Sequence, residues 1–313
     1  MRIHTLSFNP AIDQTITLDR LTPGDVHRAT SVRHNAGGKG VNVASCLADR
    51  GVAAIAHGVL GIDNAAPFDA LFAAKAIDDR FVRVAGSTRT NLKIVDATGT
   101  TDINLDGIAV DDTCIGQVIA TLDQAVGPGD LVIMAGSLPP GCPDDIYARL
   151  IARLRGQGCR VLLDTSGSPL KAALDADILP DIVKPNHAEL SAWTGADAMD
   201  ADALVEAAGK LRQRGVELVV ISMGEDGALF FSQEGAVAAK LSIEDVASTV
   251  GAGDAMVAGI AAGLHEKAAL DRLARLATAF AAGKLGMAGP NLPDAAAIDA
   301  LIARTSITAL PRG

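Results

Sequence analysis

The sequence lacks most features of secreted, membrane-bound or metal-binding proteins. It holds only four cysteines, which are widely spaced, form no CxxC pair and stand in no His/Cys cluster with metal-ligand spacing. No segment approaches the ~20 apolar residues that span a bilayer, and MRIHTLSFNP lacks the basic start and long apolar run of a signal peptide. We therefore expect reduced core thiols, a cytoplasmic location and no membrane partner.

Positive charge, linkers and repeats are also scarce. The formal net charge is -10, which argues against a nucleic-acid surface but leaves room for a local basic pocket that binds a small anion. No low-complexity tract or long linker interrupts the 313 residues, of which 49% are hydrophobic. These features predict one compact domain over residues 1–313 whose partners are small molecules.

Short β-branched runs alternate with longer amphipathic stretches in the second half of the chain. The alternation is typical of parallel strands joined by right-handed helical crossovers, hence of an α/β layered fold. We expect helices near 143–156 and 200–214, and strands at LVIMAG (131–136), RVLLD (160–164), IVKPN (182–186), LVVIS (218–222) and ALFF (228–231).

Polar residues follow these strands, and a different pattern precedes them. Asp164, Asn186 and Ser222 stand at predicted strand ends, which is the edge where open α/β sheets bind ligands. QTITLDRL (14–21) and LKIVDATGTTDINL (92–105) alternate with period two, so we expect antiparallel strands outside the main sheet. The sequence thus predicts a ligand site beside a small β lid.

A first glycine cluster lies in STVGAGDAMVAGIAAGL, residues 248–264. If a helix begins near Gly253, its first backbone N–H groups are unpaired and its dipole favours an anion, which small residues allow to approach. Asp254 would project beside this anion hole and could accept a proton from a hydroxyl that attacks a phosphoryl group. The alternative is that Asp254 only caps the helix.

A second cluster, AGGKGVNVASCLADRG (36–51), also precedes an amphipathic helix. Here the charged residue is Lys39, which could neutralise a phosphate, while Asn42 could bind a sugar hydroxyl. A tight turn with a solvated lysine is the alternative. Neither cluster fits GxGxxG, because Met256 replaces the third glycine, and no GxxxxGK[ST] occurs.

Together these motifs resemble the ribokinase-like sugar kinases of the PfkB family. AGGKGVNVA and STVGAGDAMVAG are similar to its two signature regions, and further motifs follow in family order: NPAID (9–13), TRTNLKI (88–94), AGSLPPG (135–141), DTSG (164–167), VKPNHAEL (183–190) and SMGEDGAL (222–229). The resemblance implies a three-layer ribokinase-like fold with a mostly parallel central sheet. It also implies a discontinuous β lid formed by about 12–35 and 88–108.

The resemblance further implies site residues, with ATP and Mg²⁺ as cofactors. Catalysis would fall to Asp254 as base and to the amides of Gly251, Ala252 and Gly253. The sugar would be held by Asp13, Gly37, Gly38, Lys39, Asn42, Arg89, Lys93 and Ser137. The nucleotide would contact Lys184, Asn186, Ser222, Gly224, Gly227, Gly251 and Gly253, and Glu189 would act on Mg²⁺ indirectly, through its phosphates.

Simpler interpretations remain open for some of these residues. Asp13 could be a turn residue, Arg89 and Lys93 could be solvated strand charges, and Glu189 could be an acid of the first helical turn, where the dipole favours it. The lid strands have little chain to cover their apolar sides, which predicts a homodimer through the lid.

Within the family, AGGKGVNVA, TRTNLKI and TTDINLDG are most similar to the branch that phosphorylates ketohexose phosphates. This implies ATP-dependent phosphorylation of fructose 1-phosphate to fructose 1,6-bisphosphate, with tagatose 6-phosphate or fructose 6-phosphate as alternative acceptors. A non-catalytic sugar-phosphate or nucleotide sensor is the alternative from another class. Ser248 stands where many family members carry the Asp of a monovalent-cation site, which puts potassium activation in doubt.

Overall fold

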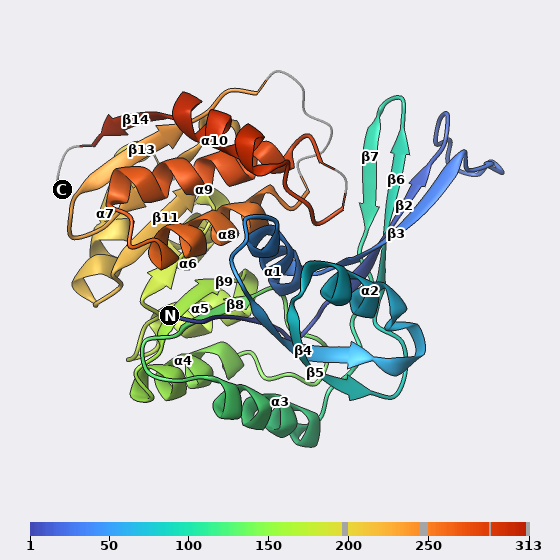
Figure 1. Cartoon of the computed structure of the whole chain (residues 1–313), viewed down its shortest axis with the longest axis horizontal. Helices are drawn as coiled ribbons and strands as arrows, with labels where there is room; N and C mark the ends of the chain where they lie inside the picture. Colours follow the sequence, from blue (N-terminus) through green and yellow to red (C-terminus); the bar gives the residue numbers. More distant parts are fainter. Residues whose placement is uncertain (196–199, 244–249, 288, 311–313) are drawn as a thin grey trace.

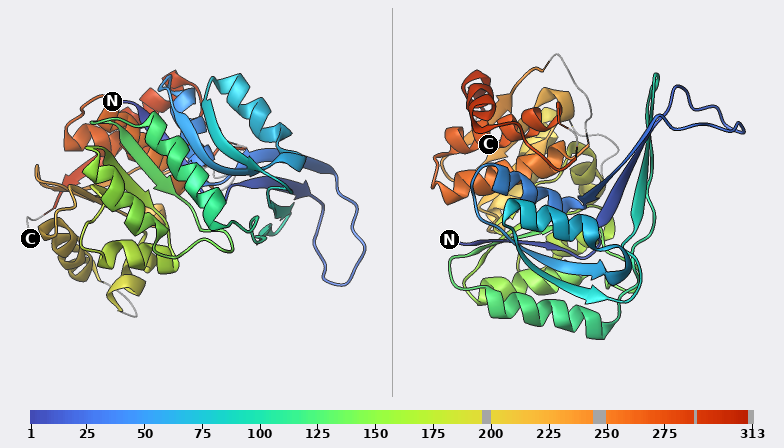
Figure 2. Two further views of the ribbon diagram at one scale, coloured as in Figure 1. Left: turned by 90° about the horizontal axis from the view of Figure 1, so that it is seen from below. Right: turned by 45° about the vertical axis from the view of Figure 1, so that its right-hand side comes forward.

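The protein folds into three layers, with a large sheet between two layers of helices and a small sheet projecting from one side (Figures 1 and 2). The structure, a computed structural model, describes residues 1–195, 200–243, 250–287 and 289–310. The layered α/β architecture with a mostly parallel central sheet and a small second sheet confirms the fold class expected from the sequence.

The large sheet has ten strands. Their spatial order is β14 (Ser306–Ala309), β13 (Ala236–Lys240), β12 (Ala228–Phe231), β11 (Leu218–Ser222), β10 (Ile182–Val183), β9 (Arg160–Asp164), β8 (Leu131–Ala135), β1 (Ile3–Ser7), β4 (Ile55–Gly61) and β5 (Asp78–Val84). Neighbouring strands from β11 to β5 in this order pair in parallel. The neighbours from β14 to β11 pair antiparallel.

The central strand β8 is apolar along its whole length, and both of its faces are covered. In β8, Leu131 and Ile133 belong to one hydrophobic core, whereas Val132 and Met134 belong to the other. Alternate side chains point to opposite faces of a strand, so a buried parallel strand reads as a continuous apolar run. Strands are present at all five expected runs, 131–136, 160–164, 182–186, 218–222 and 228–231, but β10 is limited to Ile182–Val183 and β12 pairs antiparallel to its neighbours.

Helices cover both faces of the large sheet (Figure 1). One layer contains α1 (Lys39–Asp49), α2 (Ala66–Lys75), α8 (Ala252–His265), α9 (Leu270–Lys284) and α10 (Ala295–Arg304). The other contains α3 (Asp112–Ala125), α4 (Ile146–Gly156), α5 (Gly167–Asp175), α6 (His187–Thr194) and α7 (Ala201–Gln213). Short 3₁₀ turns are η1 (Ile62–Asn64) and η2 (Gly224–Asp226). The helices predicted near 143–156 and 200–214 correspond to α4 and α7.

The small sheet corrects one expectation. Its order is β3 (Ser31–Gly37), β2 (Ala11–Thr17), β6 (Thr90–Asp96) and β7 (Gly99–Ile103). The outer pairs are antiparallel, as the sequence predicts, but β2 and β6 pair in parallel, so the prediction is wrong for this central pair. The chain passes through β4, α2 and β5 of the body between β3 and β6, and β6 therefore reaches β2 by a long connection rather than a hairpin.

Two expectations about composition can be compared with the structure. All four cysteines are free thiols, and Cys46, Cys114 and Cys159 are buried, in agreement with core thiols. Among the helices that the structure describes, none is both long and apolar enough to cross a bilayer.

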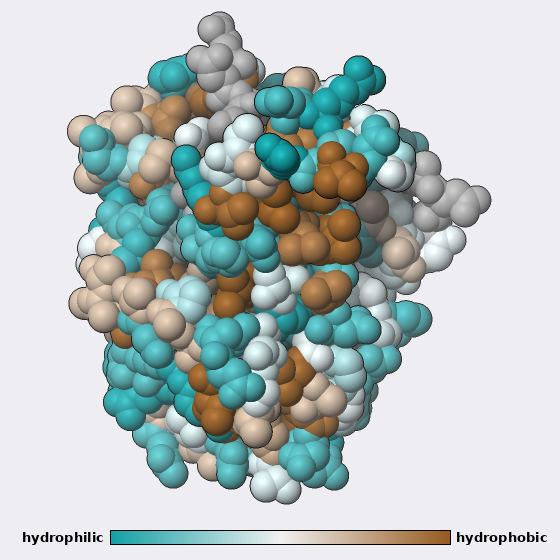
Figure 3. Space-filling model, turned by 90° about the vertical axis from the view of Figure 1, so that its right-hand side faces the viewer, coloured by the Kyte–Doolittle hydropathy of each residue, from teal (hydrophilic) through white to brown (hydrophobic). Residues whose placement is uncertain are grey.

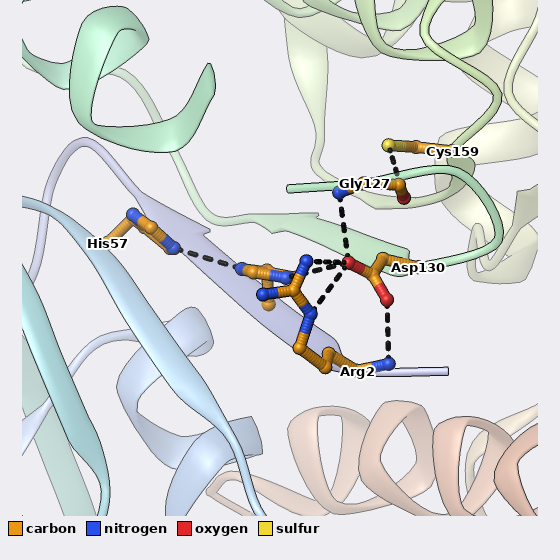
Figure 4. Close-up of polar contacts among 6 residues, drawn as sticks. Arg2, His57, Gly127, Asp130 and Cys159 are labelled. Carbon is orange, nitrogen blue, oxygen red and sulfur yellow. Dashed lines mark hydrogen bonds and ion pairs between the residues drawn. The ribbon is translucent and has the colours of Figure 1, made fainter. Parts of the chain in front are cut away.

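A buried polar cluster lies at the N-terminal end of the central strand β1 (Figure 4). The fully buried rings of His4 and His57 are joined by a 3.1 Å hydrogen bond between Nδ1 and Nε2. His4 Nε2 lies 3.5 Å from a carboxylate oxygen of Asp130, which also accepts hydrogen bonds from Arg2 and from the amide of Gly127. This arrangement ties β1 to β4 and to the start of β8.

The histidine pair predicts a loss of stability on acidification. Burial is the main cause that lowers the pKa of both rings, to about 3 for His57, whereas the ordinary value is 6.5. As the pH falls from 6.5 toward 3, the unfolded chain therefore binds a proton at His57 that the folded protein does not bind. The stability contributed by neutral His57 is complete above this range and is lost within it.

We expect His57→Gln to flatten this dependence. The slope of the unfolding free energy against pH should fall by up to about 1.4 kcal/mol per pH unit below pH 6.5, as measured by urea denaturation. The exposed His265→Gln serves as the control and should keep the wild-type slope. Equal slopes in wild type and His57→Gln would contradict the assignment.

Candidate active site

The N-terminus of α8 presents open backbone amides. Gly251 is the N-cap with a left-handed φ of 81°, and no side chain of the described residues caps the helix. A Cβ on Gly251 would stand 3.1 Å from Cε of Lys284, and one on Gly253 would stand 3.7 Å from Nζ of Lys184. Both glycines therefore keep side-chain atoms out of a space that is bordered by lysines. Unpaired amides at a helix N-terminus favour an anion there.

Asp254 points into the protein rather than capping α8. Its side chain is buried, and one carboxylate oxygen accepts a 2.7 Å hydrogen bond from Nδ2 of Asn42 in α1. Burial raises the pKa of Asp254 to about 6, although the positive charge of Lys39 opposes this rise. A carboxylate with a pKa close to neutrality, held in one orientation, has the properties of a general base.

Three charged side chains form an ion-paired bridge next to this acid. Asp164, at the end of β9, is 1% exposed and lies 3.2 Å from Nζ of Lys39 and 3.0 Å from Nζ of Lys184. Burial opposes the charges of Asp164 and Lys39, but their mutual attraction outweighs it, so the pKa of Asp164 is lowered and that of Lys39 is raised. Lys39 is thus not a solvated turn lysine.

The glycines before α1 fix the position of Lys39, the first residue of that helix. Gly38 has a φ of 96°, and a Cβ there would come within 2.7 Å of the Cα of Pro10. A Cβ on Gly37 would come within 2.7 Å of a carboxylate oxygen of Asp13. Only glycine lets this turn pass so close to β2.

The small sheet faces the body across a cavity of about 270 Å³. The expected sugar-binding residues Asp13, Asn42 and Lys93 line it together with Gly251. Nζ of Lys93 lies 4.0 Å from Asp13 and 3.2 Å from Asp102. Burial raises the pKa of Asp13 against the effect of Lys93. The glycine that begins α8 and three of the residues expected to hold the sugar therefore meet in one space.

Arg89 and Ser137 make contacts that the sequence did not predict. The guanidinium group of Arg89 donates hydrogen bonds to the backbone carbonyls of Asn9, Pro10 and Leu105. The hydroxyl of Ser137 accepts a 3.2 Å hydrogen bond from Nδ2 of Asn9. Arg89 therefore holds the chain between β1 and β2 where it enters the small sheet.

The residues expected to hold the nucleotide gather at the ends of β10 and β11. Asn186 caps α6 and exchanges hydrogen bonds with Glu189 in a capping box, and it forms a parallel bridge with Ser222. Gly224 and Gly227 both have positive φ, and a Cβ on Gly227 would meet the carbonyl of Ala239 at 2.1 Å. The capping box agrees with the simpler interpretation of Glu189 as an acid of the first helical turn. Its charge nevertheless contributes to the raised pKa of Lys39.

Two residues of the site have no role in the sequence-based prediction. Asp164 was recognised as a polar residue after a strand, but its contact with two lysines joins positions far apart in the chain. Lys284 lines the cavity from the end of α9, where its local sequence gives no signal. Ser248, on which the doubt about potassium depends, lies outside the described residues.

Comparison with known proteins identifies the family. Residues 6–296 match the family described as pfkB family carbohydrate kinase. The chain belongs to the PfkB family.

Its relatives are sugar-phosphate kinases. The PfkB chain is 53% identical to a 1-phosphofructokinase of Xanthomonas campestris over 90% of each chain, and 46% identical to one of Rhodobacter capsulatus over 99% of each. Among solved structures, phosphofructokinase-2 from Escherichia coli, in complex with substrates and products, aligns with a TM-score of 0.90 and 28% identity, covering 97% of this chain and 99% of that one. The same E. coli enzyme has also been solved in a tetrameric inhibited form.

Proposed function

We propose that this PfkB protein transfers the γ-phosphoryl group of ATP to fructose 1-phosphate and so forms fructose 1,6-bisphosphate. The observation that carries the proposal is Asp254, a buried acid with a raised pKa directly beside the open amides of α8. Binding alone requires no base at this place, which argues against a silent sensor. The relatives named 1-phosphofructokinase support fructose 1-phosphate as the acceptor. A cytoplasmic location belongs to the same proposal.

Asp254 and the α8 amides divide the chemistry between them. Asp254, oriented by Asn42, accepts the proton of the attacking sugar hydroxyl. The hydroxyl oxygen then bonds to the γ-phosphorus while the bond from that phosphorus to the bridging oxygen of ADP breaks. The amides of Gly251, Ala252 and Gly253 stabilise the charge that develops on the transferring group.

The lysine bridge lies between the two substrates. Lys39 comes from the sugar side and Lys184 from the nucleotide side, and Asp164 holds their ammonium groups together. Both ammonium groups can then face the phosphoryl group that is transferred from the nucleotide to the sugar. Mg²⁺ prefers oxygen ligands such as phosphates, and when bound it would neutralise charge on the nucleotide. Glu189 would act on Mg²⁺ indirectly, through the nucleotide phosphates.

The small sheet is proposed as the lid of a single catalytic domain that spans residues 1–313, with the lid formed by about 12–35 and 88–108. Lys93 reaches the cavity from the lid, whereas Asn42 and Gly251 reach it from the body. Closure over the sugar phosphate would exclude water, whose attack would waste ATP.

The test is ADP release by purified protein with a panel of fructose 1-phosphate, fructose 6-phosphate and tagatose 6-phosphate. The proposal expects turnover that depends on a sugar phosphate, with fructose 1-phosphate leading in kcat/KM. A lead for tagatose 6-phosphate or fructose 6-phosphate would change the acceptor and keep the kinase. Binding of these ligands without any ADP release would instead favour a sensor.

The lid also carries the features of a homodimer interface. Paired positions in β2, β3, β6 and β7 place Ile16, Val32, Leu92, Ile94 and Ile103 on one face, opposite to the face with Lys93. Val32 and Ile103 are 47% and 43% exposed. Figure 3 shows apolar side chains gathered on the side of the molecule where the lid lies. We propose that the lid of a second copy covers this face, since an open apolar sheet face is a typical interaction surface.

Light scattering should therefore report a dimer at micromolar concentration. Ile103→Asp places a charge on the apolar face and should shift the protein toward monomer. Ile178→Asp, which changes an isoleucine with 44% exposure outside the lid, is the matched control and should leave the mass unchanged. A wild-type protein that remains monomeric would refute the interface.

A further inference from the structure

Lys284 is a buried cation that the proposed mechanism does not use. It is the last residue of α9 and is only 5% exposed. Its ammonium group donates a 2.9 Å hydrogen bond to the backbone carbonyl of Met287, just beyond the helix. Burial lowers the pKa of Lys284, whereas the partial negative charge at the C-terminal end of the helix favours the protonated lysine.

The side chain of Lys284 runs along the glycine that begins α8. The position that a Cβ of Gly251 would take lies 3.1 Å from Cε and 4.0 Å from Nζ of Lys284. Lys284 and Gly251 also line the same cavity, together with Asn42. The lysine tail therefore packs against the turn that exposes the amides of the anion hole.

The charge of Lys284 is not neutralised by a close ion pair within the described part of the chain, where no carboxylate oxygen lies within 4 Å of its ammonium group. Lys39 and Lys184, by contrast, share the carboxylate of Asp164. Asp254 and Asp13 act on Lys284 from a longer distance. Its field is therefore available to an anion that docks at α8, and burial weakens solvent screening of that field.

We propose that Lys284 is a positioning residue of the anion hole, which fixes the Gly251 turn and adds a positive charge behind the amides that receive the γ-phosphoryl group. The inference rests on the proposed function, because it assumes that the γ-phosphoryl group of ATP reaches α8. It places the effect of Lys284 on the transferring phosphate rather than on the phosphate of the acceptor sugar.

The first experiment distinguishes an effect of Lys284 on the transferring phosphate from an effect on the phosphate of the acceptor sugar. Lys284→Met keeps an unbranched apolar chain against Gly251 and removes the charge. We expect kcat with fructose 1-phosphate to fall by about 100-fold while the KM for the sugar phosphate stays within about threefold. A raised KM with an unchanged kcat would overturn the inference and assign Lys284 to acceptor binding. Lys210→Met, far along the chain on the exposed face of α7, is the matched control and should behave as wild type.

The second experiment does not depend on the acceptor. Calorimetric titration should show that Lys284→Met weakens MgATP binding by about three- to tenfold but leaves MgADP binding within about twofold, because only ATP places a phosphate at α8. Equal effects on both nucleotides, or none, would overturn the inference. If wild type phosphorylates no ketohexose phosphate, the proposed function fails, and this comparison still decides the role of Lys284.

A third measurement guards against misfolding. In Lys284→Ala, ammonium or methylammonium ions should restore part of the lost kcat, whereas tetramethylammonium at equal ionic strength should not, because it has no N–H to donate to the Met287 carbonyl. Rescue by all cations alike, or by none in a variant with a wild-type melting temperature, would contradict a specific ammonium position.

Discussion

Replacement of Asp254 by Asn is expected to lower kcat by about 10³-fold or more while nucleotide binding stays within several-fold of wild type. The amide preserves the shape and can keep a contact with Asn42, but it cannot accept a proton from the sugar hydroxyl. Steady-state kinetics with fructose 1-phosphate and titration with MgADP provide the two measurements. Asp202→Asn, an exposed acid of α7, is the control and should retain wild-type kinetics.

The pH profile gives this prediction a second readout. Burial raises the pKa of Asp254 to about 6, and only the ionised carboxylate can act as a base. The kcat of wild type should therefore fall as the pH decreases through about 6, whereas the residual activity of Asp254→Asn should lack this step. A variant that keeps more than about a tenth of wild-type kcat would show that another group is the base.

The second large effect concerns the phosphate of the acceptor. We expect kcat/KM for fructose 1-phosphate to exceed that for free fructose by at least about 10³-fold, because binding of the phosphate can orient the hydroxyl toward the γ-phosphoryl group. Lys93 lines the cavity, and among the residues described its ammonium group forms ion pairs only with Asp13 and Asp102. A dianionic phosphate can compete with these carboxylates for its ammonium group.

Lys93→Met should remove most of this preference. A loss of about 2–4 kcal/mol in transition-state stabilisation is expected for fructose 1-phosphate, with little change for free fructose. Arg89→Ala should act in the same direction, but it also releases the backbone carbonyls of Asn9, Pro10 and Leu105, so its effect is less specific. Equal efficiency of wild type on fructose and fructose 1-phosphate would reject a phosphate pocket in the lid.

Much of the fold was determined by local sequence. The apolar runs at β8, β9, β10 and β11 are typical of strands with both faces covered, so they predict buried strands of a parallel sheet. The glycine clusters predict two helix starts, which the structure places at Lys39 and Ala252. In both cases the physical cause lies within a few residues of the feature, and sequence therefore suffices.

The arrangement of the small sheet was decided only by tertiary structure. Alternation along β2 and β6 predicts strands but says nothing about their relative direction. They pair in parallel because the body strands β4 and β5 intervene in the chain and return it to the same end of the sheet. Pairing of this kind depends on contacts between distant residues rather than on local pattern.

The site shows the same division between local sequence and tertiary structure. The sequence by itself determined that Asp254 follows a glycine turn and that a helix begins near Lys39, because a backbone with φ near 90° requires glycine at those turns. Only tertiary structure could bring Asp164 between Lys39 and Lys184, or lay Lys284 against Gly251. Charges and burial act through space, so residues far apart in the chain set the pKa of Asp254 and the field at the anion hole.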